Sequence, residues 1–168
     1  NAEIKQQTQT KFPYEPLISI ITPTYNTPEE FLVEMLESVL KQTYTKWELC
    51  IADGASQGNR IKDILETFSR KDKRIRITFL PENKGIVGNS SEAVALATGE
   101  FIGLLDHDDI LAPFALFEVV KHINNDVQVD YLYSDEDKIS QDGIIRFAPH
   151  FKPDWSPDTL RSMNYPTH

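Results

Sequence analysis

Three carboxylates lie within four residues of one another, at Asp106, Asp108 and Asp109, directly after the apolar run over residues 101–105. Carboxylates this close repel one another, and a position at the end of a buried strand raises the cost of keeping them charged. A bound divalent cation is the simplest compensation, because Mg²⁺ and Mn²⁺ prefer oxygen ligands. The cluster therefore predicts a divalent cation that in turn binds phosphates.

The same cluster also fits a solvated turn, in which Asp108 or Asp109 caps the helix that follows. Acidic turns are common, so the spacing alone does not decide between a turn and a cation site. The buried strand that precedes the cluster favours the cation. His107, which separates the carboxylates, is more typical of a spacer than of a ligand.

The charge of the chain restricts its partners. The 168 residues suggest one domain, and their net charge is −9. Binding to nucleic acid without sequence preference needs lysines and arginines against the phosphates, so we expect no nucleic-acid partner. A phosphorylated small ligand is compatible with this charge where a metal ion mediates.

The cysteine content indicates a reducing compartment, and the hydropathy pattern indicates neither a membrane span nor a signal peptide. Cys50 is the single cysteine, so the sequence holds no disulfide framework and no zinc-ligand spacing. No apolar stretch is long enough to span a bilayer, and no signal peptide is visible. The chain begins at Asn1 and stops at His168 without an obvious terminator, so we expect it to be a piece of a longer protein.

Apolar, β-branched segments alternate with amphipathic segments along the chain. Strands are expected over residues 17–22, 47–52, 75–80, 101–105 and 129–133. Helices are expected over residues 28–40, 61–68, 86–97 and 113–123. Thr27 and Glu30 can form a capping box for the first of these helices. The alternation predicts an α/β fold with a mostly parallel, doubly wound sheet and helices on both faces.

The two ends of the chain carry weaker patterns. Residues 1–16 start with a polar stretch and are expected to be a linker or an irregular lead-in. Gly143 is expected to turn a short hairpin between residues 138–140 and 144–147. The tail over residues 149–168 is expected to be irregular with short helical turns.

Polar residues follow each expected strand, and in a sheet of this kind ligands bind at the carboxyl ends of the strands. The loop over residues 22–26 offers hydroxyls, an amide and an aromatic ring, which suit a nucleoside or simply a well-formed turn. Asp53 can accept a hydrogen bond from a base or a ribose, or form an Asx-turn. Lys84 and Gly85 can place a cation and a bare backbone near phosphate, although a lone lysine is usually just solvated. A second acidic cluster, over residues 135–137, fits acceptor contacts or a charged loop.

Several enzyme classes lack their motifs in this sequence. There is no GxxxxGK[ST], GxGxxG or Gly-x-Ser-x-Gly, which argues against P-loop enzymes, dinucleotide dehydrogenases and α/β-hydrolases. A metal-dependent phosphatase or nucleotidyltransferase is a rival interpretation of the aspartates. An aspartyl phosphatase of the common Asp-x-Asp type places its motif after the first strand, whereas Asp106 follows the fourth.

Taken together, the motifs resemble the family 2 glycosyltransferases and the nucleotide-binding half of their GT-A fold. The matching motifs are residues 20–26, 38–44, 47–53, 83–85, 97–101 and 105–109. Residues 133–138 and 151–158 look like the subgroup found in bacterial polysaccharide and O-antigen synthesis. The resemblance implies a GT-A (Rossmann-like) nucleotide-diphospho-sugar transferase fold over residues 17–168, with the acceptor-binding part truncated at the C-terminus.

The resemblance also implies a role for each matching residue. Asp53 is expected to hydrogen-bond the base, usually uracil or thymine. Asp108 is expected to be the direct ligand of Mn²⁺ or Mg²⁺, with Asp106 as the other carboxylate of the metal site, turned towards ribose or sugar. The residues expected to bind the nucleotide are Thr22, Pro23, Tyr25, Asn26, Asp53, Lys84, Gly85 and Asp106.

Two departures from the family pattern affect the expected chemistry. Many relatives carry a second aspartate where this chain has Gly54, so one nucleotide contact is lost or moved. Relatives place the catalytic base in the acceptor half, which puts it beyond His168. Asp137 is the candidate base within this chain.

The function implied by the resemblance is metal-dependent, inverting transfer of a sugar from a UDP- or dTDP-sugar to a hydroxyl of a glycan or lipid-linked acceptor. The alternative is a non-catalytic nucleotide-sugar-binding module, or a fragment of a larger polysaccharide synthase. We expect the protein in the cytoplasm, at the inner face of the plasma membrane. The resemblance leaves room for peripheral membrane association through the rest of the protein.

Overall fold

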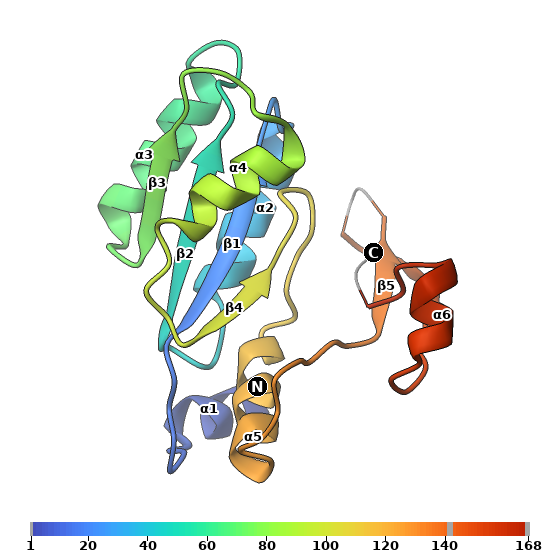
Figure 1. The fold of residues 1–168 in the computed structure, drawn as a ribbon. Coiled ribbons are helices and arrows are strands. Elements are labelled where there is room, and N and C mark those ends of the chain that lie inside the picture. Colours follow the sequence, from blue (N-terminus) through green and yellow to red (C-terminus); the bar gives the residue numbers. More distant parts are fainter. Residues whose placement is uncertain (1, 141–142, 167–168) are drawn as a thin grey trace. The chain divides into compact units, whose positions relative to one another are not determined.

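The chain folds as two compact units in the computed structural model, which describes residues 2–140 and 143–166 (Figure 1). Unit 1 covers Asn1–Val127, and unit 2 covers Gln128–His168. The sequence had suggested one domain over residues 17–168, so the division after Val127 is a finding of the structure.

Unit 1 is built on a four-stranded sheet whose neighbouring strands are all parallel. Its strands are β1 (Ile18–Thr24), β2 (Trp47–Asp53), β3 (Ile75–Phe79) and β4 (Phe101–Leu104). Their order across the sheet is β3-β2-β1-β4, so the chain runs outward from β1 to β3 and then returns to the other side of β1. The predicted parallel α/β sheet is confirmed, and the strand order places a switch point between β1 and β4.

Helices cover both faces of this sheet, as predicted. In Figure 1, α4 lies in front of the sheet, and α2 and α3 lie behind it. The helices of unit 1 are α1 (Ala2–Gln9), α2 (Glu29–Leu40), α3 (Arg60–Lys71), α4 (Gly85–Val94) and α5 (Ala115–Asn125). Within the described residues, no helix is long and apolar enough to cross a membrane.

The core has two layers because successive side chains of a strand point to opposite faces of the sheet. Ile20 of β1 belongs to a large cluster that includes Leu36 of α2 and Leu65 of α3. Ile21 belongs to a smaller cluster with Ala93 of α4. Full burial of one such aliphatic side chain contributes about 1.5–3 kcal/mol. The two layers therefore fix the carboxyl ends of the strands, where the candidate site lies.

Two local predictions for unit 1 are wrong. Residues 2–9 form α1, where a linker or irregular lead-in was expected. Thr27 does not cap α2, because the N-cap position is taken by Pro28 and the Thr27 hydroxyl is buried without a hydrogen-bond partner. The first strands and helices otherwise lie where the hydrophobic pattern placed them.

Unit 2 contains an antiparallel hairpin and a short helix. The hairpin pairs β5 (Glu136–Ile139) with β6 (Arg146–His150), and α6 covers Pro157–Ser162. The hairpin around Gly143 and the short helical turn in the tail were both predicted. The strand expected over residues 129–133 is wrong, since these residues are irregular.

Glu48 supplies a pH-dependent prediction for the fold. Its carboxylate is 5% exposed and accepts hydrogen bonds from Ser19 and Thr98, and it pairs with Arg76 at 2.9 Å. Burial opposes ionisation of this group, but the hydrogen bonds outweigh burial and lower the pKa of Glu48 to about 2. Because the folded-state pKa lies below the unfolded one, the carboxylate stabilises the fold at pH above about 4.5.

We expect Glu48→Gln to lower the free energy of unfolding by about 3 kcal/mol at pH 7. The difference from wild type should shrink as the pH falls from about 4.5 to 2, because both proteins are then uncharged at this position. Urea unfolding across this range measures it, with Glu34→Gln as the control because Glu34 is exposed on α2. A difference that stays constant with pH would contradict this role for the Glu48 charge.

Candidate functional site

The loops that follow β1 and β2 are hydrogen-bonded to each other at the carboxyl end of the sheet. Thr24 and Asp53 are register partners at the ends of these strands. Beyond them, the backbone N–H of Asn26 donates to Ser56 Oγ at 2.8 Å. The N–H of Gln57 donates to Asn26 Oδ1 at 2.8 Å. Two of the predicted nucleotide-binding segments therefore form one connected surface.

Asp53 is the centre of this connection. It is 4% exposed, and its carboxylate accepts hydrogen bonds from Thr24 Oγ1 (3.0 Å), Ser56 N (3.0 Å) and Ser56 Oγ (2.6 Å). The side-chain-to-backbone turn that was the alternative to base binding is thus present. Ala55 inside the turn has φ of 60°, a left-handed conformation that residues other than glycine seldom adopt. Such strained backbone concentrates at functional sites.

The loop after β3 is fixed by Asn89 of α4, which was not among the predicted site residues. Asn89 is 3% exposed; its Oδ1 accepts from Lys84 N at 3.1 Å, and its Nδ2 donates to Asn83 Oδ1 at 2.9 Å. Gly85, with φ of 71°, donates its N–H to the same Asn83 oxygen. Polar residues follow Asn89 in α4, so no pattern in the sequence marks this asparagine as buried.

Gly54 packs against this third loop. A side chain at Gly54 would collide with the amide of Asn89 and lie 3.0 Å from Asn83 Oδ1. The absence of a Cβ therefore lets the loops after β2 and β3 approach each other. This contact gives a local physical reason for glycine at the position where the family resemblance led us to expect aspartate.

The remaining predicted nucleotide-binding residues differ in their exposure. Tyr25 is 40% exposed and Pro23 is half-buried, so both can border a ligand. Thr22 is fully buried, and its hydroxyl has no hydrogen-bond partner. Lys84 forms an ion pair with Glu92 at 2.6 Å, and the hydrogen bond to Glu92 raises the pKa of Lys84. Lys84 is therefore paired with a counter-ion and is not a lone solvated lysine.

The acidic loop, defined here as residues 106–109, lies at the switch point beside β1. Leu104 is the register partner of Ile21, and the N–H of Leu105 donates to the Ile21 carbonyl at 3.1 Å. The loop therefore leaves the sheet on the opposite side of β1 from Asp53. Asp108 is 56% exposed, and its carboxylate lies 3.7 Å from His107 Nδ1.

The structure excludes the helix-cap interpretation of the acidic loop. The next helix, α5, begins at Ala115, and its N-cap position is occupied by Phe114 without a side-chain cap. Asp108 and Asp109 lie too early in the sequence to cap it. The predicted alternative of a capping aspartate is therefore wrong.

The donor set of the acidic loop fits a hard cation that takes further ligands from a substrate. Within residues 2–140 and 143–166, no group of three or more His, Cys, Asp or Glu side chains could hold a metal by itself. Mg²⁺ and ions like it are commonly held by one or two carboxylates together with water and substrate phosphates. Asp108 and Asp106 can supply that smaller number of oxygen ligands.

In unit 2, the candidate base Asp137 is already engaged. Its carboxylate lies 2.6 Å from Arg146 Nη1. Asp135 accepts a hydrogen bond from Lys152 N at 2.8 Å, and Glu136 forms an ion pair with Lys152 at 2.8 Å. The second acidic cluster therefore holds β5, β6 and the following segment together.

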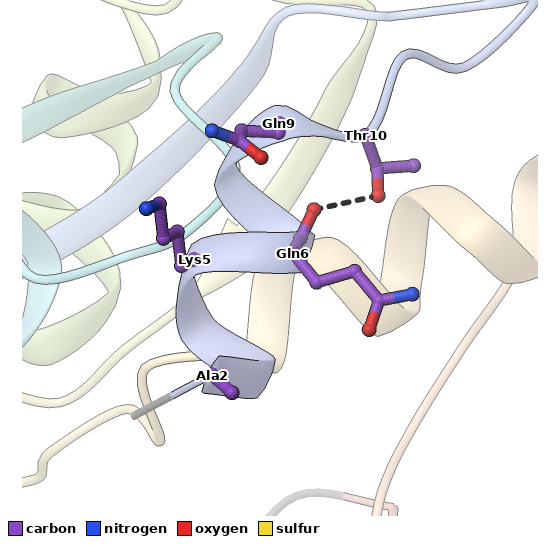
Figure 2. Close-up of a pocket in the computed structure, with 5 residues that line it drawn as sticks. All are labelled: Ala2, Lys5, Gln6, Gln9 and Thr10. Atoms are coloured by element: carbon purple, nitrogen blue, oxygen red, sulfur yellow. Dashed lines mark hydrogen bonds between the residues drawn. The ribbon is translucent and has the colours of Figure 1, made fainter.

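A shallow hollow beside α1 contains none of the predicted site residues. Figure 2 shows its polar lining, in which Thr10 Oγ1 donates to the Gln6 carbonyl at 2.9 Å. α1 lies at the end of the sheet opposite to the strand arrowheads in Figure 1. The carboxyl ends of the strands, rather than this hollow, carry the candidate site.

Comparison with known proteins identifies the family to which the sequence and the fold point. Residues 19–163 match the family described as Glycosyl transferase family 2. The O-antigen biosynthesis protein RfbC of Myxococcus xanthus is 37% identical over 163 residues, which are 97% of this chain and 13% of that protein. The UDP-Glc:alpha-D-GlcNAc-diphosphoundecaprenol beta-1,3-glucosyltransferase WfgD of Escherichia coli is 35% identical over 130 residues, 77% of this chain and 49% of that protein. The chain spans less than half the length of either relative.

A solved structure shows the same fold. The crystal structure of S. aureus TarS 1-349 in complex with UDP-GlcNAc is similar to this chain with a TM-score of 0.59 and 26% sequence identity. The similarity covers 65% of this chain and 31% of that one.

Proposed function

This chain belongs to glycosyl transferase family 2 and has the GT-A fold, and from this premise we propose that unit 1 binds a nucleoside diphosphate sugar whose sugar the protein transfers to an acceptor hydroxyl. The observation that carries the proposal is the joined surface around Asp53. Hydrogen bonds join the loops after β1 and β2 there, and Gly54 packs against the loop after β3 and Asn89 of α4. The acidic loop follows β4, on the other side of β1.

In this proposal each loop takes one part of the donor. Asp53 binds the base, and Tyr25 and Asn26 border the nucleoside. The backbone around Gly85 approaches the phosphates. The complexes of relatives favour uridine as the nucleoside, since TarS was solved with UDP-GlcNAc and WfgD is named for UDP-Glc. We therefore take a UDP-sugar as the donor, with a dTDP-sugar as the second choice.

Asp108 and Asp106 are proposed to hold a divalent cation, Mn²⁺ or Mg²⁺, against the diphosphate. When bound, the cation would neutralise the charge that grows on the leaving nucleoside diphosphate, an effect typically worth several kcal/mol. Asp108 suits this role because it is exposed, and because the acidic loop carries three carboxylates that gain from a positive charge.

The acceptor side of the reaction is proposed as a direct displacement with inversion at the sugar. A carboxylate base takes the proton of the attacking hydroxyl, which typically contributes 10²–10⁴-fold. Asp137 is the candidate in this chain, and Arg146 must release it before it can accept a proton. The names of the relatives favour a glycan or lipid-linked acceptor in polysaccharide synthesis. Such an acceptor is consistent with a cytoplasmic protein at the inner face of the plasma membrane.

Release of UDP separates a transferase from a non-catalytic binding module. The protein would be incubated with UDP-glucose or UDP-GlcNAc, Mn²⁺ and an undecaprenyl-diphosphate-linked sugar. We expect UDP release that depends on the acceptor and on the metal. Binding of the UDP-sugar without release in the presence of acceptor would favour the binding module instead.

A further inference from the structure

The acidic loop is hydrogen-bonded to the rest of unit 1 on both sides, before and after its residues. At its start, the N–H of Leu105 donates to the Ile21 carbonyl at 3.1 Å, which extends the β1–β4 pairing. At its end, residues 111–116 are hydrogen-bonded to the C-terminal part of α2 and the residues after it. These bonds join positions 70 to 74 residues apart in the sequence, so they are tertiary contacts.

The side chain of Gln42 makes three hydrogen bonds, two of them to residues 111–116. Its Nε2 donates to the Ala112 carbonyl at 2.8 Å and to the Ser38 carbonyl at 3.2 Å. Its Oε1 accepts from the N–H of Leu116 at 3.0 Å. Gln42 is 5% exposed. Both ends of its amide are therefore used in a place that water scarcely reaches.

Ser38 binds the first residue of this segment, Leu111. Its Oγ accepts from the N–H of Leu111 at 3.1 Å and donates to the Met35 carbonyl at 2.7 Å. The backbone N–H of Thr43 adds a bond to the Pro113 carbonyl at 2.8 Å. Three consecutive residues that follow the acidic loop are thus bound to one helix and its end.

The backbone N–H groups in the first turn of α5 need hydrogen-bond acceptors from outside the helix. A helix begins with N–H groups that have no partner inside the helix, and Phe114 at the N-cap offers no side-chain acceptor. Gln42 Oε1 supplies the acceptor for Leu116. A shift of the segment would leave buried polar groups unpaired on both sides, which is unfavourable. The amide of Gln42 therefore restricts where the acidic loop can end.

We propose that Gln42 and Ser38 are positioning residues that hold the acidic loop in the conformation that binds a divalent cation together with a nucleoside diphosphate. The inference rests on the proposed function, because it assigns that cation to Asp108. In this proposal neither residue is itself a ligand of the cation. They act through the three residues, 111–113, that follow the loop.

Gln42→Ala is the direct test. Removing a group that orients a metal ligand typically lowers the affinity for the metal 10–100-fold. We therefore expect the variant to bind Mn²⁺ about 10–100-fold more weakly in the presence of UDP, measured by the electron paramagnetic resonance signal of free Mn²⁺. Ser38→Ala should weaken binding in the same direction, and Ser38→Thr, which keeps the hydroxyl, should restore much of it.

Tyr44→Phe is the matched control. Tyr44 is also buried and donates a tertiary hydrogen bond, from its hydroxyl to the Pro16 carbonyl at 2.6 Å, but it has no bond to residues 111–116. Hydrogen exchange of the amides over residues 106–112 gives a second readout in the free protein. We expect faster exchange there in Gln42→Ala and no change in Tyr44→Phe.

Three results would count against the inference in different ways. Unchanged exchange over residues 106–112 in Gln42→Ala would overturn it without any ligand being involved. Equal loss of Mn²⁺ affinity in Gln42→Ala and Tyr44→Phe would show a general loss of stability and would also overturn it. If wild-type protein binds UDP without regard to Mn²⁺, the proposed metal site fails, and the assignment of Gln42 to a metal loop fails with it.

Discussion

Asp108→Ala is expected to remove most of the Mn²⁺-dependent part of UDP binding, with a loss of about tenfold or more in affinity. The proposed metal site has few protein ligands, so the loss of one leaves the cation held chiefly by the diphosphate. Asp108 is 56% exposed, and exposed substitutions usually change stability by less than about 0.5 kcal/mol. Affinity should therefore fall while the melting temperature stays close to that of wild type.

Calorimetric titration with UDP at saturating Mn²⁺ measures this effect. Asp63→Ala is the matched control, because it removes the same charge from an exposed position on α3. A general electrostatic effect of net charge would change both variants alike. Wild-type affinity in Asp108→Ala would contradict the assignment of this aspartate to the cation.

Asp53→Asn is expected to damage both stability and nucleotide binding. The carboxylate accepts three hydrogen bonds, and the NH₂ group of asparagine cannot accept the ones it replaces. An unpaired buried group costs about 1–3 kcal/mol, so the free energy of unfolding should fall by that amount. Loss of a charge-assisted contact to the base should weaken UDP binding by roughly 10–100-fold.

Ser56→Ala separates the two effects of Asp53→Asn. It removes the Ser56 Oγ donor but leaves the carboxylate in place. We expect it to lower stability, as measured by urea unfolding, with a smaller loss of UDP affinity than Asp53→Asn. If the two variants lose the same affinity, Asp53 acts only by holding the loops, and its proposed contact with the base is wrong.

The fold of unit 1 could be predicted because its two central strands, β1 and β2, are buried on both faces. Segments such as Ile18–Thr24 and Trp47–Asp53 are therefore almost continuously apolar and β-branched. The amphipathic pattern of α2 and α3 then marks the crossovers between parallel strands. Right-handed, alternating connections leave few other arrangements for such a pattern.

The failures came from segments whose structure depends on distant partners. The pattern of residues 129–133 is typical of a strand, but Tyr131 packs against Trp155 and Tyr133 packs against Tyr165. No short-range pattern contains these ring contacts. Residues 2–9 are polar all round, so α1 has no apolar stripe that periodicity could detect.

The candidate site was predictable in position but not in detail. Strand ends located Asp53 and the acidic loop, since polar residues directly follow apolar runs there. Asn89 and Gln42 were not selected as site residues, because their roles lie in side-chain hydrogen bonds that periodicity does not contain. Asn89 binds the loop just before α4, and Gln42 binds the first turn of α5, 74 residues later. Lys84 was considered near phosphate, and only the structure shows its pairing with Glu92 eight residues later.

The most direct test of the central claim is calorimetric titration of the wild-type chain with UDP, in the presence and absence of Mn²⁺. The claim is that the strand-end loops bind the nucleoside diphosphate and the acidic loop holds its cation. It predicts saturable binding that strengthens at least about tenfold when Mn²⁺ is present. Binding of equal strength with and without Mn²⁺, or no binding of UDP at all, would contradict it.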